Sequence, residues 1–332
     1  MRWRRLAGFL LVGLVMHLVL VRVYTRLMVE HKAIRSDRAF LFRAPDHVSV
    51  LVCGDSHPRT AIDPNRLGEG VVNYAIGGEH YLKTWYRMRA ALERTDRTID
   101  TLLLPLEVNS FSSWHAWNFA PEYVWGRYVD FLEIGRVRGD PWPYATRQLK
   151  ASLFPYAGEL RTLAQLRSGR FGFGEELPTG SFTELSRSEQ RQAARDQAIT
   201  HFRGQEVVDP GLKWAFDQLV GWAHQHDVRL VLVAFPVTWD YWTFAQRSGA
   251  PEQVQQQVVD PLLASDPEVI RLDYHGLFFG QNDLFSDPHH LNPEGRLRFT
   301  RQLRQDLIAR GVLDPAVPAA EGEAPEDPVE EP

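Results

Sequence analysis

Five short apolar runs, each bounded by turn residues, limit most strongly how this chain folds. They cover residues 47–53, 71–76, 101–106, 228–235 and 269–273. Apolar runs of this length are typical of strands that are buried on both faces of a parallel sheet. Amphipathic patterns of helical period alternate with them, at residues 83–94, 209–226, 251–263 and 293–309. The alternation predicts an α/β sandwich with a parallel sheet.

Composition narrows the possible functions. The chain has 332 residues, 44% of them apolar, which suffices for one large domain or two small ones. A net charge of -5 provides no basic surface of the kind that nucleic-acid binding requires, so we expect no nucleic-acid partner. Cys53 is the only cysteine, which excludes an intrachain disulfide and any zinc site built on several cysteines.

The N-terminus carries a hydrophobic segment. Three arginines in the first five residues precede an apolar run over residues 6–21, and Arg22 and Tyr24 follow it. The run is at the short end for a membrane span, and flanking Arg and Tyr suit the interface. We predict an uncleaved signal anchor over residues 1–29, which makes this a single-pass membrane protein with an outer, extracytoplasmic domain. A cleaved signal peptide and an amphipathic surface helix are the alternatives.

The remaining chain divides into a folded part and a tail. Residues 314–332 are nearly all Pro, Ala, Gly, Asp and Glu, a composition that predicts a disordered acidic tail. The folded domain then spans residues 30–313. An insertion at about 112–205 interrupts its rhythm and carries a group of tryptophans and an Arg- and Gln-rich helical stretch near 185–200.

The first chemical signal is Gly-Asp-Ser-His at residues 54–57, directly after the first predicted strand. Loops that leave the carboxyl ends of parallel strands meet at one edge of the sheet, where ligands bind. Ser56 at the start of a helix is either a nucleophile or, with Asp55, an ordinary helix cap.

The second signal lies in "FSDPHHLNPEG", residues 285–295. The three-residue spacing of Asp287 and His290 lets the carboxylate turn back onto the imidazole. A serine hydroxyl needs a base, and the base needs an acid that orients it, so Ser56, His290 and Asp287 supply the three parts of a catalytic triad. A capping Asp followed by surface histidines is the alternative.

Together, Gly-Asp-Ser after the first strand and Asp-x-x-His before the last helix resemble the SGNH hydrolase superfamily, the GDSL esterases and lipases. The resemblance covers residues 48–110 and 228–310 and implies a three-layer α/β/α fold of flavodoxin-like type. It also implies that Ser56 is the nucleophile and that its backbone N–H contributes to an oxyanion hole. "NYAIGGEHY", residues 73–81, is similar to the second family block and puts Gly78 in that hole, with Gly77 as the alternative.

The third family block is altered. The superfamily usually has Gly-x-Asn-Asp there, whereas this chain has Glu107, Asn109 and Ser110 at the matching positions. Asn109 remains the candidate for the third oxyanion donor. Divergent membrane-anchored members act on cell-envelope polysaccharides as acetyltransferases or deacetylases, so the resemblance implies a serine-dependent esterase or acyltransferase that acts on a glycan or lipid ester without a cofactor or metal.

Two alternatives remain open. The altered third block allows a catalytically silent module that binds a glycan or an assembly partner. Asp55-x-His57 also looks like the opening of calcineurin-type metallophosphoesterases, in which His80, Asp287, His289 and His290 could complete a metal site. The other motifs of that family are missing from the sequence.

Overall fold

The computed structural model describes residues 2–24, 40–41, 43–117, 142, 146, 149, 153, 177–202 and 206–317. The chain divides into two compact units, residues 1–39 with 119–176 and residues 40–118 with 177–332. Most of the predicted insertion between residues 118 and 176, and the predicted tail from residue 318 onward, lie outside the described residues. The predicted domain boundaries therefore stay predictions.

The first unit contains helix α1 (Arg2–Tyr24). At 23 residues, α1 is about 35 Å long, which matches the thickness of a bilayer's hydrocarbon core. Within the described residues it is the one helix that is long and apolar enough to cross a membrane. Length and composition thus agree with a spanning helix, while the orientation of the chain stays a prediction.

The second unit is built on a five-stranded parallel sheet, as the sequence predicts. The strands are β1 (His47–Val52), β2 (Val71–Asn73), β3 (Thr98–Pro105), β4 (Arg229–Ala234) and β5 (Ile270–Asp273). They pair in the order β2-β1-β3-β4-β5, and every pair is parallel. This is a flavodoxin-like order. Each strand overlaps its predicted apolar run.

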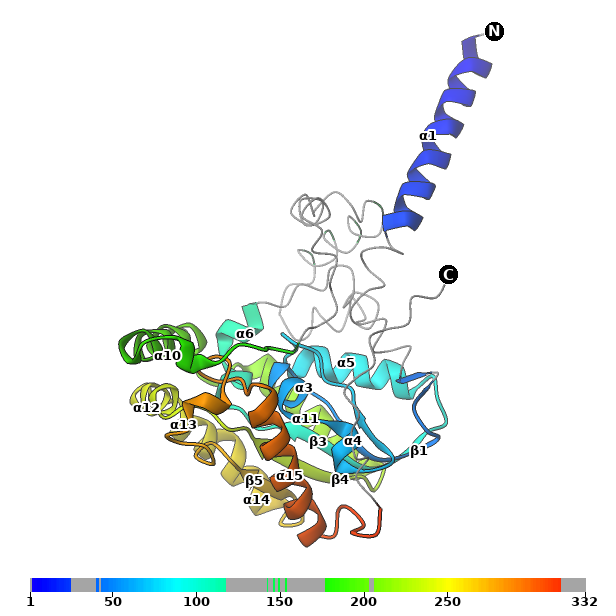
Figure 1. Cartoon of the computed structure of the whole chain (residues 1–332). Helices are drawn as coiled ribbons and strands as arrows, with labels where there is room; N and C mark the ends of the chain where they lie inside the picture. Colours follow the sequence, from blue (N-terminus) through cyan, green and yellow to red (C-terminus); the bar gives the residue numbers. More distant parts are fainter. Residues whose placement is uncertain are drawn as a thin grey trace. The chain divides into compact units, whose positions relative to one another are not determined.

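Helices flank the sheet (Figure 1). Alternate strand residues such as Val50, Leu103 and Val231 form one core cluster with α3 (Ser56–Ala61), α4 (Pro64–Leu67) and α15 (Pro293–Ala309). The residues between them, such as Leu51, Leu102 and Leu232, are also fully buried. Helices α5 (Tyr81–Leu92) and α11 (Pro210–Gln225) pack against each other over that second face. Burial of both strand faces explains the uninterrupted apolar runs.

Several shorter elements fill the connections. They are η2 (Val108–Phe111), α6 (Ser113–Trp117), η4 (Phe182–Glu184), α10 (Arg187–His201), α12 (Trp239–Arg247), α13 (Ala250–Val254), η5 (Gln255–Val259), α14 (Asp260–Ser265) and η6 (Asn282–Leu284). The single helix predicted at residues 251–263 is interrupted by η5, which is a π-helical turn. Pro261 lacks the N–H that would continue α-helical bonding across this segment.

Helix α15 docks on the end of α3 through polar contacts. The buried Thr300 hydroxyl donates to the Ala61 carbonyl (3.1 Å) and accepts from the Asp63 N–H (3.1 Å). The Arg296 guanidinium donates to the Ile62 carbonyl at 3.0 Å. These bonds satisfy carbonyls at the C-terminal end of α3 and fix the two helices against each other.

Gly295 in the first turn of α15 allows this helix to pack closely. A Cβ at this position would lie 2.1 Å from the Leu284 carbonyl oxygen, which is a backbone atom and cannot shift without cost.

We therefore expect Gly295→Ala to lower the free energy of unfolding by about 2 kcal/mol or more in urea titrations of the full-length chain in detergent. Gly221→Ala is the control, because a Cβ there, inside α11, would meet no atom within 4 Å apart from its chain neighbours and the backbone of its own helix. It should be neutral or stabilise by about 0.5–1 kcal/mol. Equal effects of the two changes would contradict the close contact.

Candidate active site

The candidate residues meet at the carboxyl edge of the sheet. Ser56 follows β1, Asn109 follows β3, and Asp287 and His290 lie on the loop that enters α15. Strands β2 and β3 lie on opposite sides of β1, so the chain changes direction at this point of the sheet. In open α/β sheets, ligands bind in the crevice at such a switch point.

Ser56 is held at a tight turn between β1 and α3. Gly54 adopts φ +123°, and a Cβ there would lie 2.5 Å from Cδ of Pro105, so only glycine fits. Asp55 is the N-cap of α3 and accepts from the His57 N–H at 2.9 Å. The capping interpretation of this motif is thus right for Asp55, and it leaves Ser56, which is partly exposed, as the first residue of the helix.

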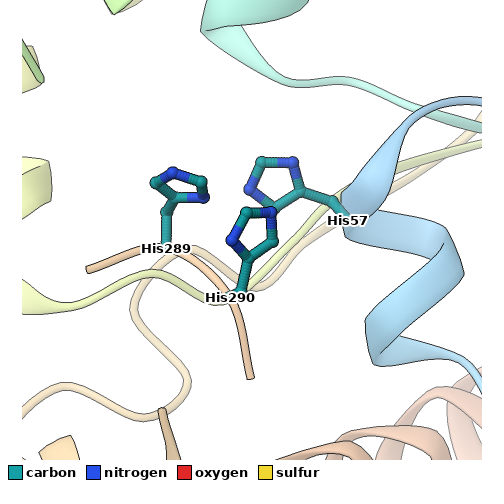
Figure 2. A group of neighbouring side chains, drawn as sticks. All are labelled: His57, His289 and His290. Atoms are coloured by element: carbon teal, nitrogen blue, oxygen red, sulfur yellow. The ribbon is translucent and has the colours of Figure 1, made fainter. Parts of the chain in front are cut away.

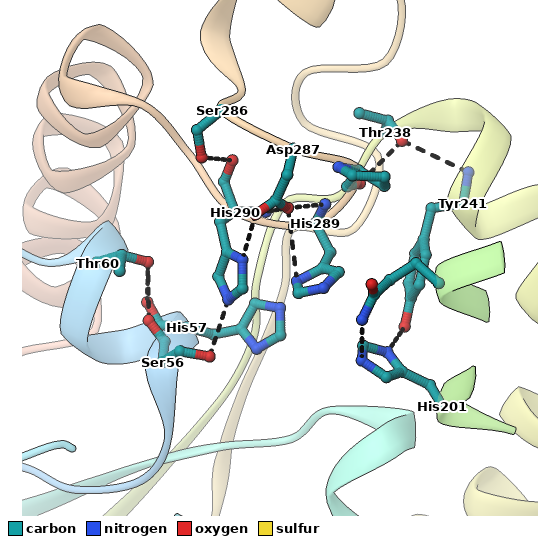
Figure 3. A network of polar contacts seen from close by, with 12 residues as sticks. Ser56, His57, Thr60, His201, Thr238, Tyr241, Ser286, Asp287, His289 and His290 are labelled. Carbon is teal, nitrogen blue, oxygen red and sulfur yellow. Dashed lines mark hydrogen bonds and ion pairs between the residues drawn. The ribbon is translucent and has the colours of Figure 1, made fainter. Parts of the chain in front are cut away.

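The Ser56, His290 and Asp287 side chains form a continuous chain of hydrogen bonds (Figure 3). Oγ of Ser56 lies 2.8 Å from Nε2 of His290, and Nδ1 of His290 lies 2.8 Å from Oδ2 of Asp287. An ionised carboxylate only accepts, so Nδ1 carries the proton and Nε2 is free to accept from the Ser56 hydroxyl. The structure brings together the three residues that the sequence singled out, although Ser56 and His290 are 234 positions apart.

Asp287 is a strong hydrogen-bond acceptor in this loop. Its Oδ1 accepts from the backbone N–H groups of His289 and His290, both at 2.9 Å. Burial acts to raise the pKa of the Asp287 carboxyl, but its bonds to the His290 ring and to the two amides outweigh burial and lower it. Asp287 therefore stays ionised and fixes the orientation of the His290 imidazole.

His57 packs against His290, the candidate base. It is buried, and its ring stacks on the His290 ring with centroids 5.1 Å apart. Nδ1 of His57 lies 3.4 Å from Oδ1 of Asp55. Burial favours the neutral imidazole, but the carboxylates of Asp55 and Glu107 outweigh it and raise the His57 pKa to about 9. The two carboxylates thus favour the protonated form of this buried imidazole beside the nucleophile.

Three further histidines extend from this pair, and the sequence analysis considered only His289 among them, as a ligand in the metallophosphoesterase alternative. The His289 ring lies 4.0 Å from the His290 ring, the His201 ring lies 4.9 Å from that of His289, and the His115 ring lies 6.1 Å from that of His201. Burial lowers the pKa of His289 well below its usual value, that of His201 to about 3 and that of His115 to about 4. These three imidazoles are neutral, and Nδ1 of His201 contacts the Tyr241 hydroxyl at 2.7 Å.

His57, His289 and His290 also form a candidate metal-ligand set (Figure 2). Each offers a ring nitrogen, and these atoms lie within 4.8 Å of one another. Within the described residues this set includes no carboxylate, whereas hydrolytic two-metal sites are bridged by carboxylates. Asp287 binds His290, and His80 caps α5 by accepting from the Lys83 N–H at 3.4 Å, so only the three histidines of the donor set expected for a metallophosphoesterase lie together.

The candidate oxyanion donors occupy loops at the same edge. Gly78 is exposed and adopts φ +76°, which favours glycine. Asn109 is buried in η2, and its amide lies 3.4 Å from Nε2 of His115. Asn73 of the same predicted block has another task, because its amide donates to the Pro58 and Ile62 carbonyls at the end of α3. The roles of Gly78 and Asn109 in an oxyanion hole stay predictions.

A buried ion pair supports the Gly78 loop. The Arg87 guanidinium donates to Glu79 (3.0 Å) and to the Tyr74 carbonyl (2.8 Å), and it stacks on the Tyr74 ring at 3.6 Å. Both charged side chains are almost completely buried. Removing one partner of such a pair leaves an uncompensated charge, so this contact fixes the loop between β2 and α5. Sequence reasoning missed the pair because its members are eight residues apart on different elements.

Glu107, at the position where the resemblance to the SGNH superfamily leads us to expect glycine, has structural partners. Its carboxylate accepts from the Phe235 N–H at 2.6 Å and lies 3.6 Å from Nε2 of His275. The side chain thus joins the carboxyl ends of β3 and β4. Glu107 thus ties two strands together, and its carboxylate helps to raise the pKa of His57.

Comparisons with known proteins leave the family open. No protein-family model matches the chain, and no curated protein matches it. Among solved structures, it is similar to a Streptococcus pneumonia protein provisionally described as a platelet activating factor, with 12% sequence identity and a TM-score of 0.44. That likeness covers 88% of this chain and 99% of the other.

The buried histidines predict an unusual pH dependence of stability. His115, His201 and His289 have lowered pKa values in the folded chain, so below pH 6.5 they bind protons in the unfolded state but not in the folded state. The free energy of unfolding therefore falls with decreasing pH, by up to about 1.4 kcal/mol per pH unit for each of them. Above pH 6.5 the folded state gradually loses the favourable charge of His57 and of His275, whose pKa is also raised to about 9. We expect maximal stability near pH 6.5 in urea titrations.

His201→Gln tests the acidic side of this profile. The change removes one buried imidazole, so the slope of unfolding free energy between about pH 4 and 6.5 should become shallower. Comparing slopes separates this effect from any general loss of packing. A slope equal to that of the wild type would show that His201 is protonated in the folded chain.

Proposed function

We propose that this chain is a serine-dependent ester hydrolase or acyltransferase of the SGNH type. The observation that carries the proposal is the unbroken hydrogen-bond chain from Asp287 through His290 to the partly exposed Ser56. Its geometry has the distances that a nucleophile, a general base and an orienting acid require. These three residues are the proposed catalytic residues.

In the proposed mechanism, Nε2 of His290 takes the Ser56 proton as Oγ attacks the ester carbonyl. Asp287 holds the imidazole in the required tautomer and stabilises the imidazolium. His290 then gives its proton to the departing alkoxide, which leaves an acyl group on Ser56. Water or a sugar hydroxyl, deprotonated by the same imidazole, attacks the acyl-enzyme and regenerates the serine.

The tetrahedral intermediate carries an oxyanion that must be stabilised. The backbone N–H of Ser56 lies in the first turn of α3, where N–H groups have no partner within the helix. Together with the Gly78 N–H and the Asn109 amide, it is the proposed oxyanion hole. The His57 charge lies beside the nucleophile and adds a favourable field for developing negative charge.

The substrate class and location follow from the same proposal. With α1 as an uncleaved membrane anchor, the domain lies outside the cytoplasm, where an ester of a cell-envelope glycan or lipid is the proposed substrate. The two competing functions are a silent binding module and a metallophosphoesterase. The complete Ser56, His290 and Asp287 chain favours an enzyme, and the lack of a carboxylate among the three clustered imidazoles favours serine chemistry.

A serine-directed fluorophosphonate tests the nucleophile. We expect the full-length chain in detergent to be labelled and to release p-nitrophenol from its acetate ester. Ser56→Ala removes the nucleophile and His290→Gln removes the base, so both should lose at least about a hundredfold in rate, and Ser56→Ala should lose labelling completely. Ser265→Ala, an exposed serine on α14, is the matched control and should keep both properties. Labelling that persists in Ser56→Ala would refute the proposal.

A chelator separates serine chemistry from metal chemistry. Treatment with EDTA should leave p-nitrophenyl acetate hydrolysis unchanged, since none of the proposed steps requires a metal. Excess Zn²⁺ should inhibit reversibly, because the neutral His289 and the base His290 would then be ligands. A phosphatase activity that needs metal and survives Ser56→Ala would favour the metallophosphoesterase instead.

A further inference from the structure

A strongly basic groove lies between α10 and α12, away from the proposed triad. Its volume is about 700 Å³, and its lining consists of Arg187, Ser188, Arg191, Gln192, Arg195, Phe244 and Arg247. Figure 1 shows the two helices side by side. No acidic side chain is among the lining residues. Four guanidinium groups in one groove are conspicuous in a chain whose net charge is -5.

The arginines of α10 follow one another at intervals of four residues. Arg187, Arg191 and Arg195 therefore share one face of the helix, with a rise of about 6 Å between neighbours. The adjoining stripe, with Ala194 and Ala198, packs into a small core with Tyr241 of α12. The arginines flank this packed stripe and remain exposed, at the edge where α10 meets α12.

Most of this positive charge has no counterion within the described chain. Arg187 forms a bidentate ion pair with Asp240, whereas no ion pair is formed there by Arg191, Arg195 or Arg247. Arg247 lies over the Phe244 ring, 5.6 Å from its centroid, which holds its guanidinium in place. Like charges four residues apart, near the positive end of a helix, destabilise it. An anionic ligand would remove that repulsion.

The groove is connected to the proposed active site through both of its helices. Helix α10 ends at His201, six residues beyond Arg195, and the His201 ring lies 4.9 Å from that of His289. Tyr241 in the first turn of α12 contacts His201 at 2.7 Å. Figure 3 shows His201 and Tyr241 facing the loop that carries His289 and His290. The two helices that line the groove therefore also contribute side chains that contact the proposed catalytic loop.

We propose that this groove binds an anionic polysaccharide, whose acidic groups pair with Arg191, Arg195 and Arg247. Planar guanidinium groups match carboxylate and phosphate oxygens in bidentate geometry, and a row of them matches a polymer that repeats its charge. A bilayer surface fits less well, because the site is concave and its only apolar lining residue, Phe244, is covered by Arg247. Calling the glycan a substrate rests on the proposed function, but binding does not.

Binding of oligogalacturonate to the full-length chain in detergent, measured by calorimetry, tests the proposal. The triple variant Arg191→Gln, Arg195→Gln and Arg247→Gln should lose at least about a hundredfold in affinity, and each single change about tenfold or less. The control is Arg298→Gln, Arg301→Gln and Arg310→Gln, which removes the same charge from exposed positions on α15 or at its end. It should bind within about threefold of the wild type. Neutral dextran should not bind.

Three outcomes would contradict the proposal that the groove binds an anionic polysaccharide. They are equal affinity in both triple variants, equal binding of dextran, and binding of anionic lipid vesicles or RNA but not of oligogalacturonate. Fluorophosphonate labelling of Ser56 serves as the folding check, because the groove variants leave the triad intact. Glycan binding without any labelling of the wild type would contradict the proposed serine-dependent function but support the proposed binding groove. Labelling without glycan binding would support the serine-dependent function and contradict the binding groove.

Discussion

The docking of α15 on α3 is the contact on which the candidate site depends. Ser56 begins α3 and His290 precedes α15 by three residues, so the separation of Oγ and Nε2 is set by how these two helices pack. Thr300 and Arg296 bind three backbone groups at the end of α3, and Gly295 lets the start of α15 approach the Leu284 carbonyl. A small shift of either helix would separate nucleophile and base, and misplacement of about 1 Å costs an enzyme about a hundredfold in rate.

Charge around the base is arranged in two layers. Asp287 and Asp55, each bound to a neighbouring histidine, place negative charge on either side of the stacked His290 and His57 rings. Beyond them, His289 and His201 are kept neutral by burial. A second cation next to a protonated His57 is unfavourable, so protonation of His290 in the proposed reaction would depend on Asp287. This arrangement explains why the carboxylate is held by three hydrogen bonds instead of one.

The sequence predicts those features of the fold and site that depend on residues close together in the chain. It does not predict those that depend on contacts between distant segments. The strands, the Gly54 turn and the spacing of Asp287 and His290 are local patterns, and apolar runs, turn residues and three-residue offsets encode them directly. The π-helical turn at Gln255–Val259 was missed because a proline inside a helical pattern has several outcomes. The approach of His115 and His201 to His289, and the Glu79–Arg87 pair, arise from tertiary packing of segments without a shared motif. For the histidine cluster, the only signal in the sequence was the number of histidines, twelve in this chain.

The proposed acyl-enzyme can be attacked by water or by a sugar hydroxyl. Which of the two reacts depends on how tightly the acceptor is bound and how it is oriented. Ser56 is partly exposed, so water reaches the site and hydrolysis is always open to it. A hydroxyl that is bound and oriented, however, can react with an effective concentration of about 10⁵ M or more, far above that of any solvent. A glycan held by the arginines of α10 and α12 would be a bound acceptor of this kind, near helix ends that contact the catalytic loop at His201 and His289. In the proposed transferase, such binding of the acceptor is the means by which a sugar hydroxyl outcompetes water.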